Sequence, residues 1–291
     1  PSSEDRKSIS SESKALEVAF PFFAQDPQKK LYAQSLKRQL NKNRLFQGRT
    51  EISWKGIDSP DASILHLPRT NLGILAINNV AAAHNFGRQD LLLPLEGLFP
   101  SYQNDYLDMG WRKGVVGEHL FSVPQHVSIR LLFYRRDLLD QYFFKPPKTW
   151  EEMEKQAKTI LAGEKNDSLK GFLFNFNPPV RFTVFLDYIW SQGTELYENG
   201  PNWMLNHKAL ETALLQMDRF FKNGLTPMTV MNSDYSSTYQ DFLEGRAVFT
   251  HHWSDGIRMI QALPESERKK FGYCPVPSAS LSVQGRSTVG G

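Results

Sequence analysis

The sequence predicts an α/β protein whose chain forms two lobes. Strand-like and helix-like segments alternate from residue 15 onward, which is typical of parallel sheets covered by helices. A second alternating series follows the proline pair at 146–147, which cannot continue a helix because each proline lacks an N–H donor. The 291 residues suffice for two ordinary domains. Together these features favour two α/β lobes over one continuous sheet.

The first part of the chain has the order strand, helix, strand. Apolar residues alternate with polar or small ones from residue 15 to 20, as in a strand. Leucines spaced along residues 28–42 predict an amphipathic helix. Residues 50–54 and 60–66 are predicted as two further strands, and residues 72–86 as a helix. Since parallel strands need a crossover between them, this order indicates a parallel sheet.

The second part opens with an apolar run at 131–134 that suits a buried strand. After the proline pair, Thr149 lies at the N-cap position of a helix, and Glu152 follows three residues later. This is the spacing of a capping box, in which the two residues satisfy free N–H groups of the helix start reciprocally. Beyond it, the pattern predicts helices at 151–161, 182–190 and 208–222, and strands at 171–174 and 245–249.

The composition is that of a folded protein. Hydrophobic residues make up 40% of the chain and charged residues 22%, which argues against general disorder. The net charge of +3 is too small to indicate a nucleic-acid partner. The single cysteine, Cys274, excludes an intramolecular disulfide and is expected to be a buried thiol. Only the Ser-rich residues 1–14 are predicted to be disordered.

The sequence carries no recognisable enzyme, cofactor or metal motif. Phosphate-binding glycine loops, the Gly-x-Ser-x-Gly elbow and the His-Glu-x-x-His pair are all absent from it. His251 and His252 lack the spacing of metal ligands, and adjacent residues face opposite sides of a strand, so at most one of them joins a given site. We therefore expect a protein that is not an enzyme and that uses neither a cofactor nor a metal.

Three segments resemble one family of proteins. They read YRRDLLDQYFFKPPKTWEEMEKQAKTI at 134–160, FLEGRAVF at 242–249 followed by Trp253, and FGYCPVP at 271–277 followed by STVGG at 287–291. In this order they resemble the extracellular solute-binding proteins (family 1) of ABC importers. The likeness is greatest to the group that binds maltose and other oligosaccharides.

The resemblance implies a two-lobed periplasmic-binding-protein-like fold of type II. It also implies truncation at the C-terminus, because the family chain continues beyond the last matching segment. It places a disordered polar lead at 1–14, a discontinuous first lobe at 15–126 plus 276–291, and a second lobe at 127–275. Hinges near 124–130 and 275–283 would let the lobes close over a bound solute.

The resemblance further implies which residues of the second lobe contact the ligand. Trp253 matches a tryptophan that stacks on a sugar ring in sugar-binding members, and the alternative is a core tryptophan at a helix start. Asn177 and Arg181 lie in a loop that reaches the cleft in the family. Arg181 either binds an acidic sugar or forms a surface salt bridge. Ser128 follows the first hinge, where some sugar binders have a carboxylate.

In the first lobe, the family's ligand-contacting loops follow the first and third strands. Phe22, Phe23 and Asp26 lie after the first predicted strand, and His66 and Arg69 follow the third. The resemblance therefore implies that these five side chains form the other half of the binding site.

The predicted function is high-affinity binding of a small solute outside the cytoplasm and its delivery to the permease of an ABC importer. A carbohydrate, in particular an oligosaccharide, is the expected solute. Two alternatives stay open: a ligand-sensing domain of a signalling system with the same fold, and an enzyme with an unrecognised acid–base pair. We expect a monomer that binds no nucleic acid and that is either periplasmic or lipid-anchored on the outer face of the cell membrane.

Overall fold

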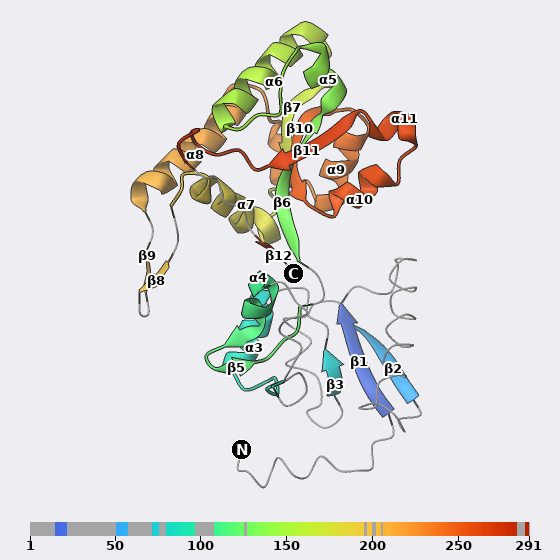
Figure 1. The fold of residues 1–291 in the computed structure, drawn as a ribbon, viewed down its shortest axis with the longest axis vertical. Coiled ribbons are helices and arrows are strands. Elements are labelled where there is room, and N and C mark those ends of the chain that lie inside the picture. Colours follow the sequence, from blue (N-terminus) through green and yellow to red (C-terminus); the bar gives the residue numbers. More distant parts are fainter. Residues whose placement is uncertain are drawn as a thin grey trace. The chain divides into compact units, whose positions relative to one another are not determined.

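A computed structural model of the chain is shown in Figure 1. Contacts divide the chain into two units, Pro1–His126 with Gly291 (unit 1) and Val127–Gly290 (unit 2). The structure describes residues 15–21, 51–57, 72–75, 80–96, 108–124, 127–194, 197–199, 202–204, 206–283 and 289–290.

Unit 1 contains a parallel sheet with the strand order β2-β1-β3. In this sheet, Val18 of β1 pairs with Trp54 of β2 on one side and with Ile74 of β3 on the other. The predicted parallel sheet is therefore confirmed, whereas the helix predicted at 28–42 and the strand predicted at 60–66 lie outside the described residues. The three strands are β1 (Ala15–Pro21), β2 (Glu51–Ile57) and β3 (Leu72–Leu75).

The helix predicted at 72–86 is wrong at its start. Residues 72–75 form β3, and helix α3 (Val80–Arg88) follows. A short apolar run fits a buried strand as well as a helix, and here pairing with β1 satisfies its backbone groups as a strand. The remaining described elements of unit 1 are α4 (Asp108–Trp111), the 3₁₀ turn η4 (Arg112–Gly114) and the antiparallel strands β4 (Val115–Val116) and β5 (His119–Leu120).

Unit 2 is built on a mixed sheet with the order β11-β6-β10-β7, and β12 also pairs with β6. Strand β6 is antiparallel to both β10 and β11, while β10 is parallel to β7. The strands predicted at 131–134 and 171–174 are present, and the one predicted at 245–249 begins at Ala247 instead. The bounds are β6 (Ser128–Arg135), β7 (Lys170–Phe174), β10 (Ala247–Trp253), β11 (Phe271–Pro275) and β12 (Val289–Gly290).

Eight further helical segments and a small hairpin are described in unit 2. The predicted helices at 151–161, 182–190 and 208–222 are all present. The segments are α5 (Arg136–Gln141), α6 (Trp150–Glu164), α7 (Pro178–Trp190), α8 (His207–Lys222), η5 (Met228–Met231), α9 (Tyr235–Leu243), α10 (Gly256–Gln261) and α11 (Glu265–Arg268), with the hairpin formed by β8 (Tyr197–Asn199) and β9 (Asn202–Met204).

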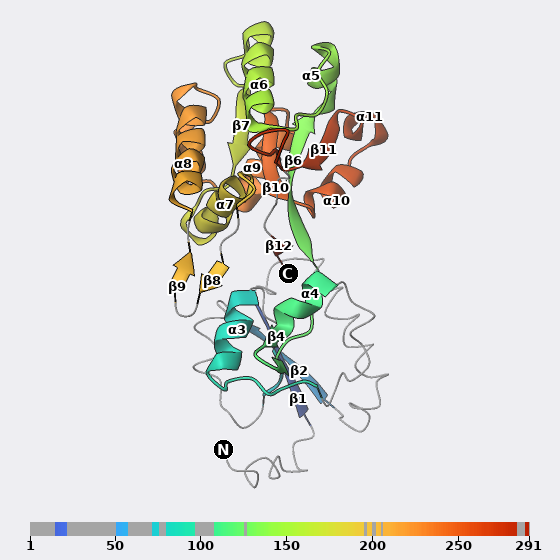
Figure 2. The same ribbon diagram turned by 60° about the vertical axis from the view of Figure 1, so that its left-hand side comes forward.

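Helices cover both faces of this sheet, as Figure 2 shows. On one face, Trp150 of α6 stacks on Tyr188 of α7 with 4.6 Å between ring centroids, and Phe220 of α8 packs on both. On the other face, Tyr239 of α9 meets Phe133 of β6 edge to face at 5.5 Å. All five side chains are fully buried. The core of unit 2 is thus aromatic on both sides of the sheet, with each ring contributing buried apolar area and preferred ring geometry.

The start of α6 confirms half of the predicted capping box. Thr149 Oγ1 accepts a hydrogen bond from Glu152 N at 3.1 Å. The Glu152 carboxylate accepts from Lys148 N at 2.7 Å, one residue before the predicted donor. A parallel bridge joins Thr149 to Ser278, in which Trp150 N donates to Ser278 O and Ser278 N donates to Lys148 O. The helix start is thereby tied to the segment that follows β11.

This bridge bears on the predicted lobe boundaries. Residues 276–291 are predicted to belong to the first lobe, whereas contacts group residues 276–290 with unit 2. Val276 and Ser278 are buried in the structure. The boundaries of the two lobes in the complete protein stay a prediction.

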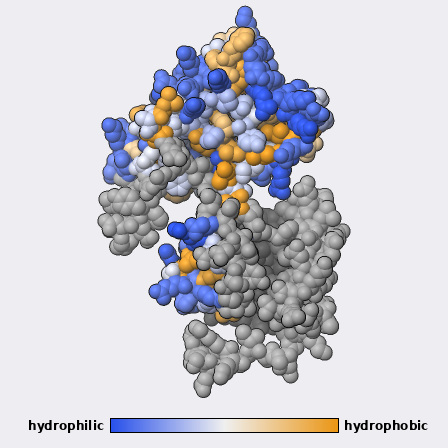
Figure 3. Space-filling view, in the orientation of Figure 1, coloured by the Kyte–Doolittle hydropathy of each residue, from blue (hydrophilic) through white to orange (hydrophobic). Residues whose placement is uncertain are grey.

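The outer surface of unit 2 is mostly hydrophilic in the described part of the face that Figure 3 presents. Cys274 is half-buried, and burial raises the pKa of its thiol to about 12, which suits an unreactive side chain. No helix among the described residues is both long and apolar enough to cross a membrane.

Candidate functional site

Trp253 is the last residue of β10 and is partly exposed. In the antiparallel pairing of β10 with β6 it lies directly opposite Arg130. Directly opposed residues project from the same face of a sheet. The Arg130 guanidinium accordingly lies over the indole, with its Cζ 4.3 Å from the ring centroid. At this distance the cation and the face of the ring attract each other.

Two side chains of α7 contact the Arg130 guanidinium. Its Nε lies 3.4 Å from Asp187 Oδ2, and its Nη2 donates to Thr183 Oγ1 at 3.1 Å. Thr183 and Asp187 are four residues apart on α7, so they lie on one face of the helix. Arg130 is 3% exposed and Asp187 0%. A buried charge pair therefore joins β6, β10 and α7 behind Trp253.

His251 belongs to the same cluster. Its Nε2 lies 3.3 Å from Asp187 Oδ2, and the side chain is fully buried. Burial, together with the Arg130 cation, holds the pKa of His251 well below its usual value, so the ring is neutral at pH 7. The counter-charge of the Asp187 carboxylate is thus Arg130. We call this group of side chains the buried cluster; its members are Arg130, Thr183, Asp187 and His251.

His252 points to the opposite face of β10, as the alternation of a strand predicts. Its ring lies between the rings of Tyr235 and Tyr239, with centroid separations of 4.0 and 4.2 Å. The Tyr235 hydroxyl donates a hydrogen bond to Asp255. Burial is the main cause that raises the pKa of Tyr235, and the hydrogen bond to Asp255 raises it further. The expectation that the two histidines do not share a site is confirmed.

Asn177 and Arg181 lie at the start of α7. Asn177 is the N-cap residue, but its side chain does not cap the helix. Pro178 and Pro179 occupy the first helical positions and lack N–H groups, so this helix start offers fewer donors to a ligand than an ordinary one. Arg181 is exposed, and its Nε donates to Phe176 O at 3.4 Å, with its Cζ 5.6 Å from the Phe176 ring.

Ser128 is the first residue of β6 and is half-buried. It lies two residues before Arg130, so both project from the same face of the strand. The neighbouring backbone is fixed to the end of β10, since Ser254 N donates to Ile129 O at 2.8 Å and Ile129 N donates to Ser254 Oγ at 3.3 Å. The structure therefore brings Ser128 and Trp253 to adjoining strands of one sheet.

The first-lobe part of the predicted site cannot be placed in the same way. Phe22, Phe23, Asp26, His66 and Arg69 lie outside the described residues, and their part in a site stays a prediction.

Sequence reasoning missed the buried cluster. Arg130 interrupts the apolar strand SIRLLFYR, and Asp187 interrupts the apolar helix PPVRFTVFLDYIW. A charge within an apolar element is the available signal, because buried charges are paired in native proteins. The sequence alone does not say which charges pair.

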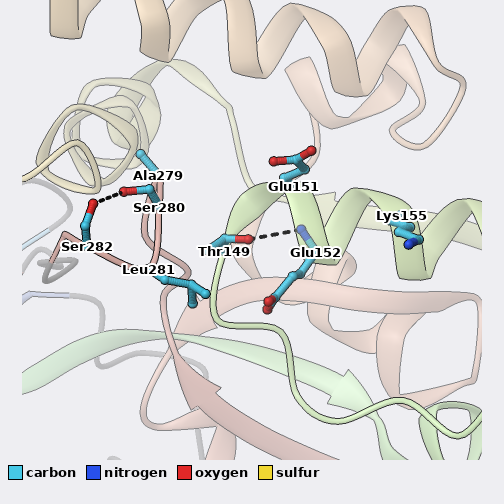
Figure 4. Close-up of a pocket in the computed structure, with 8 residues that line it drawn as sticks. All are labelled: Thr149, Glu151, Glu152, Lys155, Ala279, Ser280, Leu281 and Ser282. Carbon is cyan, nitrogen blue, oxygen red and sulfur yellow. Dashed lines mark hydrogen bonds between the residues drawn. The ribbon is translucent and has the colours of Figure 1, made fainter.

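A shallow pocket of about 560 Å³ lies elsewhere in unit 2, at the start of α6 (Figure 4). Its walls come from the first turns of α6 and from the Ser-rich segment 279–282. None of the predicted site residues lines it. Within the described part of the chain, no three His, Cys, Asp or Glu side chains are grouped so that they could hold a metal ion.

Comparisons with known proteins bear on the identity of this chain. The family model described as bacterial extracellular solute-binding protein matches residues 74–288. The chain is 38% identical over 186 residues to a probable ABC transporter-binding protein of Deinococcus radiodurans, a match that covers 62% of this chain and 44% of the relative. It is 24% identical over 146 residues to the galactooligosaccharide-binding protein of Bacillus subtilis, covering 50% and 34%. The chain thus spans less than half the length of either relative.

Among solved structures, maltose-bound MalE3 of T. maritima superposes with a TM-score of 0.77 at 22% identity. The match covers 95% of this chain and 70% of that one. At this identity the likeness shows the fold, and it confirms the predicted α/β periplasmic-binding-protein fold. The matched family consists of non-catalytic extracellular solute-binding proteins, which confirms that the chain is not an enzyme. Since the family model covers well over half of its residues, the chain belongs to the bacterial extracellular solute-binding proteins.

Proposed function

We propose that the protein binds a carbohydrate outside the cytoplasm and delivers it to the permease of an ABC importer. The observation that carries the proposal is the indole of Trp253, which is partly exposed at the end of β10 and has the Arg130 guanidinium over its ring. A flat apolar ring of this kind suits the C–H face of a pyranose. Two similar proteins, the maltose-bound MalE3 of T. maritima and the galactooligosaccharide-binding protein of Bacillus subtilis, support the same ligand class.

The rest of the site follows from the neighbouring elements. Ser128 and Asn177 would supply polar contacts to sugar hydroxyls, and Arg181 would reach the ligand from the start of α7. The prolines at the start of α7 remove N–H donors that an anion would need, which favours a neutral sugar over an acidic one. We further propose that Phe22, Phe23, Asp26, His66 and Arg69 close the site from the first lobe.

The lobes of the complete protein would close about hinges near 124–130 and 275–283 and trap the sugar. The protein would act as a monomer, either free outside the membrane or held there by a lipid anchor. In this scheme the closed form is what the permease recognises.

The test is a ligand screen by thermal shift on the whole chain, followed by calorimetric titration. Maltose, maltotriose, galactooligosaccharides and ribitol are compared with amino acids and oligopeptides. At least one carbohydrate should raise the Tm, because a ligand that binds only the native state stabilises it, by about 2.7 kcal/mol at 100 times its Kd. A shift with peptides and none with any carbohydrate would sink the proposal.

Trp253→Ala should weaken binding of the best carbohydrate by roughly tenfold or more, because an aromatic contact of this size contributes about 1.5–3 kcal/mol. Phe143→Ala serves as the matched control. Phe143 is an aromatic side chain of unit 2 that is 96% exposed, and its loss should leave the Kd unchanged.

A further inference from the structure

We infer that Arg130 is a positioning residue for ligand binding, which fixes the indole of Trp253 against the sheet and couples it to α7. The inference rests on the proposed function in so far as Trp253 contacts the ligand. Arg130 is too buried to contact a ligand itself, so it would act through Trp253.

Strand register brings Arg130 against Trp253. Arg130 and Trp253 are register partners on antiparallel strands, so the guanidinium approaches the indole from its own side of the sheet. The separation of 4.3 Å is well within cation–π range. Trp253 is the terminal residue of its strand, where the ladder ends and a side chain has the most freedom. A cation fixed over one face of the indole restricts the rotation of the ring and leaves the other face for stacking.

Two residues of α7 restrict the movement of Arg130. Asp187 and Thr183 contact separate nitrogens of the same guanidinium, Nε at 3.4 Å and Nη2 at 3.1 Å. A planar fork held at two points cannot rotate freely, whereas a single point contact leaves rotation open. Because Arg130 is 3% exposed and Asp187 is 0% exposed, water does not compete for these contacts. The orientation of Arg130 is therefore transmitted to Trp253.

Through these contacts Arg130 links two parts of the candidate site. Asp187 and Thr183 lie on α7, whose first residues follow Asn177 and include Arg181. Trp253 lies on β10. One buried guanidinium thus fixes the relative placement of an aromatic and a polar part of the site that are far apart in the sequence. Pre-organisation of this kind improves affinity because less freedom is lost on binding.

The experiment uses 5-fluorotryptophan in the whole chain and ¹⁹F NMR, with the Trp253 signal among the 6 tryptophans assigned by its loss in Trp253→Phe. In Arg130→Met, the Trp253 signal should shift and broaden, and the Kd for the best carbohydrate of the screen, with maltotriose as first probe, should rise about tenfold. Arg130→Lys keeps the charge without the planar fork and should restore the signal and the affinity only in part.

Arg219→Met is the matched control. It breaks another ion pair of unit 2, in which the exposed Arg219 places its Nη2 2.5 Å from Oε2 of the buried Glu154 carboxylate between α8 and α6. This variant should lower stability without moving the Trp253 signal or the Kd. A role of Arg130 in stability alone would make the two variants behave alike.

Arg130→Met leaves the buried Asp187 carboxylate without its cation and can prevent folding. The double variant Arg130→Met/Asp187→Leu removes both charges, and it should fold and still show the altered Trp253 signal. An unaltered Trp253 signal in a folded Arg130 variant overturns the inference. If the Arg130 variants alter the Trp253 signal but the wild-type protein binds no carbohydrate of the screen, the proposed function is overturned and the positioning of Trp253 is left intact.

Discussion

His251 and His252 are adjacent in the chain and lie on opposite faces of β10, each in a different buried environment. His251 faces Asp187 and Arg130, while His252 lies between Tyr235 and Tyr239. His252 Nδ1 lies 3.3 Å from Trp253 O, and its Nε2 lies 3.3 Å from Tyr235 O. A neutral imidazole donates to one of these carbonyls only. Burial nevertheless decides its charge state, because desolvation opposes protonation more strongly than the carbonyls and Asp255 favour it.

The first prediction concerns the pH dependence of stability. Burial lowers the pKa of His252 to about 4 in the folded protein, against about 6.5 in the unfolded chain. Between these values the unfolded state binds the proton and the folded state does not, so stability falls as the pH drops from about 6.5 to about 4. The contribution of this group is on the order of 3 kcal/mol.

Urea unfolding of the wild type and of His252→Gln at several pH values between 7 and 4 measures this effect. The free energy of unfolding of His252→Gln should depend less steeply on pH than that of the wild type. His207→Gln, an exposed histidine at the start of α8, is the control and should leave the slope unchanged. Equal slopes for the wild type and His252→Gln would contradict the prediction.

At the scale of elements, local patterns predicted most helices and strands of unit 2 because their apolar spacing matches their burial. Helix α6 illustrates this: Trp150, Met153, Ala157 and Ile160 recur at helical spacing and are all buried. Leu72–Leu75 illustrates the failure, since a short run of three apolar residues and a glycine fits either element and pairing with β1 decided for a strand. The capping box is a second such case, since the carboxylate of Glu152 bonds Lys148 N instead of the N–H of the N-cap residue.

The second prediction concerns this helix start. Thr149→Ala removes the acceptor of the Glu152 N–H and should lower the free energy of unfolding by about 1 kcal/mol. Thr159→Ala on the same helix is the matched control. Thr159 is exposed and its hydroxyl bonds only the carbonyl of Lys155, so its loss should change stability by less than about 0.5 kcal/mol. Chemical unfolding with a constant m-value checks both, and equal losses would refute the capping role.

At the scale of the whole molecule, unit 2 contains a contiguous core of its own. Its buried apolar residues run from Leu131 to Val276 and form one cluster. The edge strand β11 belongs to this core, because Phe271 packs on Phe242 of α9 with 5.1 Å between ring centroids. A continuous core of this kind is the usual mark of an autonomous folding unit.

The third prediction follows from that core. A fragment of residues 127–290 should unfold cooperatively and keep the near-ultraviolet dichroism of its packed aromatic residues. A fragment of residues 127–269 lacks β11 and should lose the sharp transition, because β6 would become an unpaired edge and Phe271 would leave a cavity beside Phe242. A non-cooperative 127–290 fragment would mean that unit 2 depends on unit 1.

The α/β class, the parallel sheet of unit 1, the main elements of unit 2 and the likeness to solute-binding proteins can all be predicted from the sequence. These predictions rest on local periodicity, on prolines and caps, and on motifs that are continuous in the chain. The contacts of Arg130 with Asp187 on α7 and with Trp253 on β10 emerge only from the folded chain. Those contacts join residues more than fifty positions apart through strand register and helix packing, and no local pattern encodes which buried charges become partners.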